Sequence, residues 1–174
     1  MIGVKFDGLS KLYKELDMAA DPKALESAVG KACSLVQSAA RLGAHVNTGE
    51  LREKILTDVR RKGLEVHGEV YTNVPQGVYQ EFGTGPEGES NHSGISPEVT
   101  PAYTLEPWWV HESQVDEADA EMYHWPSIET SDGKFYRIDG QEADPFMYPA
   151  LKNNEDKIMD IISEAIRKEI GGIG

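Results

Sequence analysis

The histidines and the single cysteine are the side chains of this sequence that could bind a metal ion or act in covalent catalysis. The five histidines show no HExxH pattern and no spacing that would place two of them on one helical face. His111-Glu112, with Asp116 nearby, is the best local metal candidate, although a solvated acidic loop supplies such neighbours by chance. Cys33 lies in an apolar stripe at helical spacing, which favours a small core residue over a ligand or a nucleophile. We therefore expect neither a metal nor a cofactor.

Motifs of hydrolases and of phosphate-binding loops give no better candidate. The sequence has no GxSxG elbow. The glycine pair Gly83 and Gly85 lacks the lysine and the following helix of a phosphate-binding loop, and a sharp turn with positive φ explains both glycines more simply. Paired carboxylates for glycoside hydrolysis stay open, because 30 acidic residues offer many pairs. The sequence favours a protein that is not an enzyme.

The negative charge is concentrated in the middle of the chain. The 174 residues include 30 acidic and 17 basic ones, a net charge of −13, and residues 86–142 alone hold 13 acidic against two basic residues. Binding to nucleic acid or to anionic lipid depends on basic residues, so we expect neither. Trp108, Trp109 and Trp125 also lie in this segment, and a base-stacking surface normally needs a basic groove, which favours core or interface anchors.

The length fits one domain over residues 1–174, and we interpret residues 86–144 as an acidic, Trp-containing insertion within it. The sequence has no apolar run long enough to span a bilayer, and its start lacks the apolar block of a signal peptide, so we expect a soluble protein made in the cytoplasm.

Apolar periodicity predicts an α+β fold, in which N-terminal helices and a long C-terminal helix pack on a small antiparallel sheet. The segment 78–82 fits a strand or a short helix. The other predicted elements are helices over 6–16, from Asp21-Pro22 to about Gly43, from an Asn47 cap through Ile55, and from Leu151 to Gly171-Gly172, with strands over 64–74 and 134–138, the latter after a turn at 131–133.

Three stretches, in this order, resemble motifs of one known family. They are a TG-x-L-R helix start, a Y-x-x-EFGTG turn and a PF-x-x-PAL entry to a C-terminal helix. The residues that carry them are Asn47, Thr48, Gly49, Leu51 and Arg52; Tyr79, Glu81, Phe82, Gly83, Thr84 and Gly85; and Pro145, Phe146, Pro149, Ala150 and Leu151. Together they resemble the tail-completion or head-tail joining family (tail terminator and neck proteins) of long-tailed bacteriophages and prophages.

This resemblance implies a structural virion protein that is not an enzyme and that acts through assembly. It implies a small α+β subunit that forms a ring with copies of itself, generally a hexamer, at the top of the tail. Such a ring ends tube growth and joins the tail to the head, so the expected partners are the tail tube protein and a neck or head-completion protein. The expected location is the tail-head junction, after synthesis in the bacterial cytoplasm. Compact family members have only a short hairpin where residues 86–144 stand here.

A closed ring needs a head-to-tail interface, and the motifs suggest one pair of residues for it. Gly83 and Gly85 allow a tight reversal that would seat Phe82 in the core and point Glu81 outward. We expect Glu81 to meet a basic residue such as Arg52, Arg60 or Arg61 across the seam.

The acidic segment has two open interpretations. In one, Glu112, Asp116, Glu117, Asp119 and Glu121 line or rim the ring, where negative walls repel the phosphates of DNA passing through it. In the other, they face solvent and only maintain solubility. A different class of function, an acidic mimic of DNA that blocks a DNA-binding partner, would also suit the charge; basic proteins should then capture the chain at low salt and release it at high salt.

Overall fold

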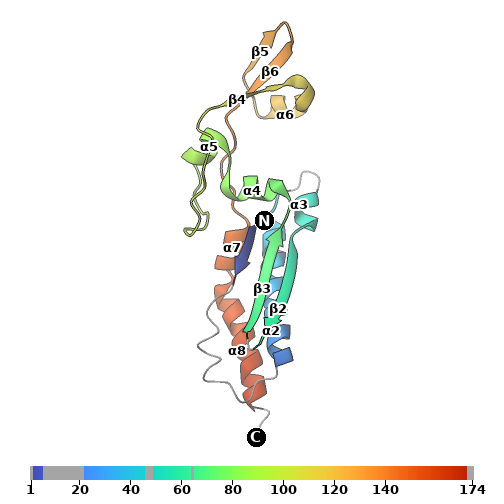
Figure 1. Cartoon of the computed structure of the whole chain (residues 1–174), viewed down its shortest axis with the longest axis vertical. Coiled ribbons are helices and arrows are strands. Elements are labelled where there is room, and N and C mark those ends of the chain that lie inside the picture. The colour runs from blue at the N-terminus through green and yellow to red at the C-terminus, as the bar shows by residue number, and fades with distance from the viewer. Residues whose placement is uncertain (1, 6–21, 46–48, 64, 172–174) are drawn as a thin grey trace. The chain divides into compact units, whose positions relative to one another are not determined.

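The structure is a computed structural model that describes residues 2–5, 22–45, 49–63 and 65–171. The chain divides into two compact units. We call residues 1–81 with 145–174 the base unit and residues 82–144 the middle unit. The described residues contain helices and two small antiparallel sheets (Figure 1), which confirms the predicted α+β class.

The sheet of the base unit has the order β1-β3-β2, and all its pairs are antiparallel. Its strands are β1 (Ile2–Lys5), β2 (Leu56–Lys62) and β3 (Glu65–Thr72). Strand β3 alternates between buried and more exposed residues, as the period of two predicts. The sequence did not predict β2, because this edge strand carries charged residues and shows no alternation of burial.

Helix α2 (Pro22–Gly43) packs against both this sheet and α8 (Glu155–Gly171). Its apolar stripe enters the core at helical spacing, as predicted. The buried core of the base unit consists of Leu25, Val29, Ala32, Cys33, Val36, Ala40, Ala44, Leu51, Ile55, Val66, Val70, Val74, Phe146, Met147, Ala150, Ile158, Ile162 and Ile166.

The predicted single C-terminal helix is two helices, α7 (Met147–Lys152) and α8. Asn154 lies at the break, where its side-chain amide donates to the backbone carbonyl of Ala150 at 2.8 Å and satisfies a carbonyl of the last turn of α7. Its own carbonyl accepts from Ile158 at 2.9 Å, within the first turn of α8.

Two short helices complete the base unit, α3 (Glu50–Glu53) and α4 (Pro75–Phe82). Phe82, the last residue of α4, is the first residue of the middle unit. Helix α3 ends two residues before the predicted Ile55, which is fully buried. Gly49 precedes α3 with φ of 80°. The predicted cap Asn47, its neighbour Thr48 and the predicted helix over 6–16 lie outside the described residues.

The middle unit contains a second antiparallel sheet, of order β4-β6-β5. Residues 134–138 form a strand and are preceded by a tight turn, as predicted, since Thr130 pairs with Gly133. The elements of this unit are α5 (Gly85–Ser90), β4 (Trp108–His111), η1 (Glu112–Gln114), α6 (Glu117–Met122), β5 (Ser127–Thr130) and β6 (Gly133–Ile138).

Of the helices in the described part of the chain, none is both long enough and apolar enough to cross a membrane.

Candidate functional site

Parts of all three motifs meet in the base unit, at a place that we call the motif junction. It comprises residues 43–45 at the end of α2, residues 51–52 of α3, residues 77–81 of α4 and residues 146–148 at the start of α7. Side chains of α3 and α4 bond to the backbone at the end of α2 and at the start of α7. Segments far apart in the sequence are thereby held together.

Glu81 forms the central contact of the motif junction. Its carboxylate is 1% exposed and accepts three backbone N–H bonds, from Phe146 and Met147 at 2.8 Å to Oε2 and from Tyr148 at 2.9 Å to Oε1. These are N–H groups that the first turn of α7 leaves without intrahelical partners, and a negative charge there also complements the helix dipole. Glu81 therefore caps α7 from a different helix.

The prediction that Glu81 points outward is wrong. Residues 75–82 form a helix, which places Gly77, Gln80 and Glu81 on one buried face and leaves Tyr79 half exposed, at 50%. A carboxylate that is buried and bonded to three N–H groups cannot pair with Arg52, or with any other arginine, across a ring seam. The predicted seam pair is therefore withdrawn.

Gln80 and Arg52 satisfy the backbone at the end of α2. The amide of Gln80 donates to the carbonyl of Gly43 at 3.0 Å and accepts from the N–H of His45 at 2.9 Å. The guanidinium of Arg52 donates to the carbonyl of Ala44 at 2.9 Å. The last carbonyls of a helix need such external donors. Gln80 is not among the motif residues predicted from the sequence. A helix that starts at Pro75 would have indicated its role, because Gly77, Gln80 and Glu81 then lie on one face.

The aromatic ring of Phe146 lies in the core. Glycines make room at this point: a Cβ atom on Gly77 would lie 2.8 Å from Cγ2 of Thr72 and 3.1 Å from Cδ1 of Leu51, and one on Gly43 would lie 3.1 Å from Cβ of Phe146. The later residues of this motif follow into α7, where Ala150 is buried, while Pro149 and Leu151 are partly buried. The PF-x-x-PAL segment is thus a packing element.

The turn after α4 belongs to the middle unit. Its glycines are required by their positive φ angles and by the close approach of another backbone segment. Gly83 and Gly85 have φ of 74° and 62°, which confirms the predicted positive φ. Thr84 between them exchanges two backbone hydrogen bonds with Gln141, of 2.9 and 3.1 Å. A Cβ atom on Gly83 would lie 2.7 Å from the Gln141 carbonyl oxygen. Phe82 is only partly buried, so the prediction of a core position is wrong.

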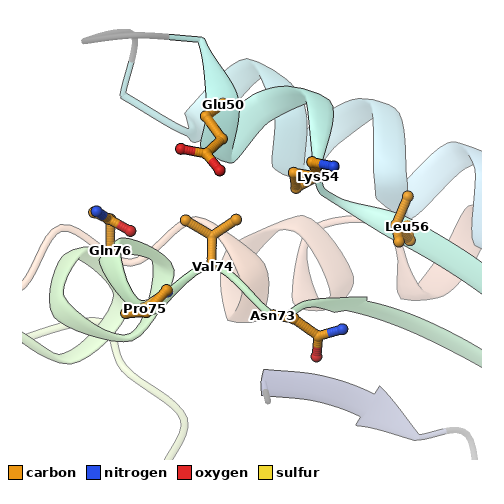
Figure 2. Close-up of a pocket in the computed structure, with 7 residues that line it drawn as sticks. All are labelled: Glu50, Lys54, Leu56, Asn73, Val74, Pro75 and Gln76. Carbon is orange, nitrogen blue, oxygen red and sulfur yellow. The ribbon is translucent and has the colours of Figure 1, made fainter.

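A pocket of about 510 Å³ opens on the base unit between α3 and the first turn of α4. Figure 2 shows the side chains that line it, with Val74 between the two segments. Its lining residues are Glu50, Lys54, Leu56, Asn73, Val74, Pro75 and Gln76. In the middle of α4, the side chains of Val78 and Tyr79 are 38% and 50% exposed to solvent. We call this pocket with Val78 and Tyr79 the α4 surface. Exposed apolar side chains beside a pocket are typical of protein contact sites.

Both ring nitrogens of His111, the histidine of the predicted metal candidate, take part in hydrogen bonds. Nδ1 of His111 bonds to the Ser113 hydroxyl at 2.8 Å, and Nε2 bonds to the carbonyl of Asp132 at 3.0 Å. Within the described ranges, no three His, Cys, Asp or Glu side chains are grouped so that they could hold a metal ion.

Cys33 lies in the core, as predicted. Its side chain is fully buried, and burial, with a smaller contribution from the negative charge of Asp58, raises the pKa of the thiol to about 11. The thiolate is therefore disfavoured at neutral pH, and Cys33 is unsuited to nucleophilic chemistry.

The five acidic residues predicted for a ring channel are all exposed in the middle unit. Two of them also bond locally: Asp116 caps α6 by accepting from Ala118 at 2.9 Å, and Glu112 accepts from the backbone of Lys134 at 3.1 Å. Glu117 and Asp119 lie in the first turn of α6, where acidic residues complement the helix dipole.

The tryptophans divide into two kinds. Trp125 stacks on Tyr123 at 5.7 Å and meets Tyr136 edge-on at 6.5 Å, within the middle unit. Trp108 and Trp109 are exposed on β4. Trp125 is an anchor of the fold. Trp108 lies on the same sheet face as the buried Ile138, with its ring next to Gly85, whereas the ring of Trp109, at 47% exposure, is available for a contact.

Residues 7–83 match the family model described as "Bacteriophage HK97-gp10, putative tail-component". The matched range runs through α2, the hairpin of β2 and β3, and α4, and includes the first motif and most of the second. The match confirms the resemblance to phage tail proteins that the motifs indicate, and this part of the chain is similar to a phage tail component. Neither the curated proteins nor the solved structures include one that matches the chain.

Proposed function

From the match of residues 7–83 to a family of phage tail components, we propose that the protein is a structural subunit of a long-tailed phage or prophage that completes the tail and joins it to the head. It acts without catalysis, as a ring of copies of itself, most simply a hexamer, in the virion. Its partners are the tail tube protein and a neck or head-completion protein. The family match is the observation that carries this proposal.

The motif junction supports a structural role for the matched segment. The side chains of Glu81, Gln80 and Arg52 are used to hold helix ends. None of these contacts forms an open polar site for a substrate. Their effect is to give the base unit a fixed shape, which a subunit needs if its copies are to close into a ring.

We place one side of the ring seam at the α4 surface. A ring interface is heterologous, so each subunit needs an exposed surface that a different surface of its neighbour fills. Val78 and Tyr79 are exposed apolar residues next to a pocket whose lining combines Leu56 and Val74 with charged and amide side chains. A buried apolar centre within a polar rim is the usual composition of such interfaces.

Light scattering on the purified protein tests this seam. We expect the wild type to reach the mass of six chains with rising concentration, and Val78→Asp to remain a monomer over the same range, because the seam would bury an unpaired charge. Met159→Asp is the matched control, since Met159 is also exposed but lies on α8. It should assemble like the wild type.

Other results would count against the proposal in distinct ways. If Val78→Asp assembled normally, the seam would lie elsewhere. If the wild type stayed a monomer at every concentration and at two salt levels, self-assembly would be ruled out and the acidic DNA mimic would become the better proposal.

We also propose that Glu112, Asp116, Glu117 and Asp119 face the channel of the ring. Their exposure and the excess of acidic residues in 86–142 support this placement. Phage particles that carry Asp116→Asn, Glu117→Gln and Asp119→Asn together should release their DNA severalfold more slowly, because a less negative wall repels phosphate less. DNA release would be followed with a dye outside the particles. The control combines Glu53→Gln, Asp156→Asn and Asp160→Asn in the base unit; equal rates in both variants would leave these residues a solubility role only.

A further inference from the structure

The two faces of the β4-β6-β5 sheet differ in how they are covered. Directly opposite residues of antiparallel strands lie on the same face. Tyr136 and Ile138 lie on one face and are buried. The other face carries Trp109 opposite Arg137, and both His111 and Ile128 opposite Phe135. We call this second face the Trp109 face.

The Trp109 face is apolar at its centre and exposed. Trp109 on β4 and Ile128 on β5 are each 47% exposed. Ile128 lies directly opposite the partly buried Phe135 on the central strand, and Trp109 lies opposite Arg137, two residues further along that strand. His111 packs edge-on against Phe135, with ring centroids 5.0 Å apart. Exposed aromatic and aliphatic side chains on one sheet face, next to a partly buried ring, are the kind of residues that carry most of the energy of a protein interface.

The net charge of the unit that carries this face favours one class of binding partner. Residues 86–142 carry 13 acidic against two basic residues. One of the two is Arg137 on the Trp109 face, and Asp139 pairs with it at 2.8 Å. A second copy of the same unit, a nucleic acid or an anionic membrane would all bring negative charge towards a unit whose net charge is negative. A Lys- or Arg-rich segment would be attracted, and its cations can also pack over the face of an exposed Trp ring.

We propose that the Trp109 face is a docking surface for a basic segment of a second protein that also carries aliphatic or aromatic side chains. The proposal rests on the assembly role above, since it supplies the contact by which the subunit binds a different virion protein. It does not depend on the ring seam, because the Trp109 face lies in the middle unit and the α4 surface in the base unit.

The test is a selection of random displayed short peptides on the full-length protein, with affinities of the selected peptides then measured in solution. We expect the peptides to be enriched in Lys and Arg together with apolar residues, and to bind more weakly at high salt. Trp109→Thr and Ile128→Thr should each weaken binding by at least about tenfold, as loss of an interface anchor does. Threonine keeps the strand propensity of both positions.

Leu105→Ser is the matched control, because Leu105 is exposed in the same unit but lies outside the sheet. It should bind the peptides like the wild type, and circular dichroism should show all variants folded. Selected peptides without basic residues, equal binding by Trp109→Thr, or no enriched peptide would overturn the proposal. If Trp109→Thr instead abolished the hexamer mass, the occupant would be a second copy; this result would overturn the proposal and leave the ring itself supported.

Discussion

Replacing Glu81 with alanine is expected to lower the free energy of unfolding by about 3–5 kcal/mol, because three backbone N–H groups at the start of α7 lose a charged acceptor in a buried place. Glu81→Gln should cost less, at about 2 kcal/mol, since the amide oxygen can still accept some of these bonds. Chemical denaturation followed by circular dichroism measures both values.

Asp160→Ala is the control for this series, because Asp160 is an exposed carboxylate on α8 and its loss should change the stability by no more than about 0.5 kcal/mol. An effect of Glu81→Ala below about 1 kcal/mol would contradict the role of Glu81 as a buried cap. The loss of stability should also weaken ring assembly, although Glu81 itself is too buried to contact a neighbour.

Removal of residues 82–144 is expected to leave the base unit folded when a short Gly/Ser linker joins Glu81 to Pro145. The two ends are already held together, since the Glu81 carboxylate lies 2.8 Å from the N–H of Phe146. The base unit also keeps its own sheet and its buried core. Because loop-closure entropy changes slowly with length, its stability should change by only about 1–2 kcal/mol.

This excision tests our proposal that residues 86–144 are an insertion into a complete domain. Cooperative thermal unfolding and retained helical circular dichroism would support it. The control is the same excision combined with Glu81→Ala, which should lose most of the remaining stability because the start of α7 then lacks its three hydrogen bonds to the Glu81 carboxylate. An excised protein that is unfolded with Glu81 intact would show that the middle unit is an integral part of the fold.

Local patterns in the sequence were sufficient for the elements whose burial follows a regular period. The stripe of α2, the alternation of β3 and the strand at 134–138 have one buried face each, so the pattern follows from local geometry. The positive φ of Gly83 and Gly85 was also predictable, because only glycine adopts it without strain. Strand β2 gave no such pattern, since an edge strand that is exposed along most of its length needs no apolar face.

The sequence by itself determined the α+β class, the concentration of acidic residues in 86–142 and the order of the three motifs. The first motif and most of the second lie in the range that matches a family of phage tail components. Only the tertiary structure decided what the motif residues do. Glu81 looked like a surface charge because carboxylates are rarely buried, and its real position depends on three N–H groups that stand 65 to 67 residues further along the chain. The exposed Trp109 face was equally hidden, since which side of a strand is covered depends on packing partners that lie outside that strand.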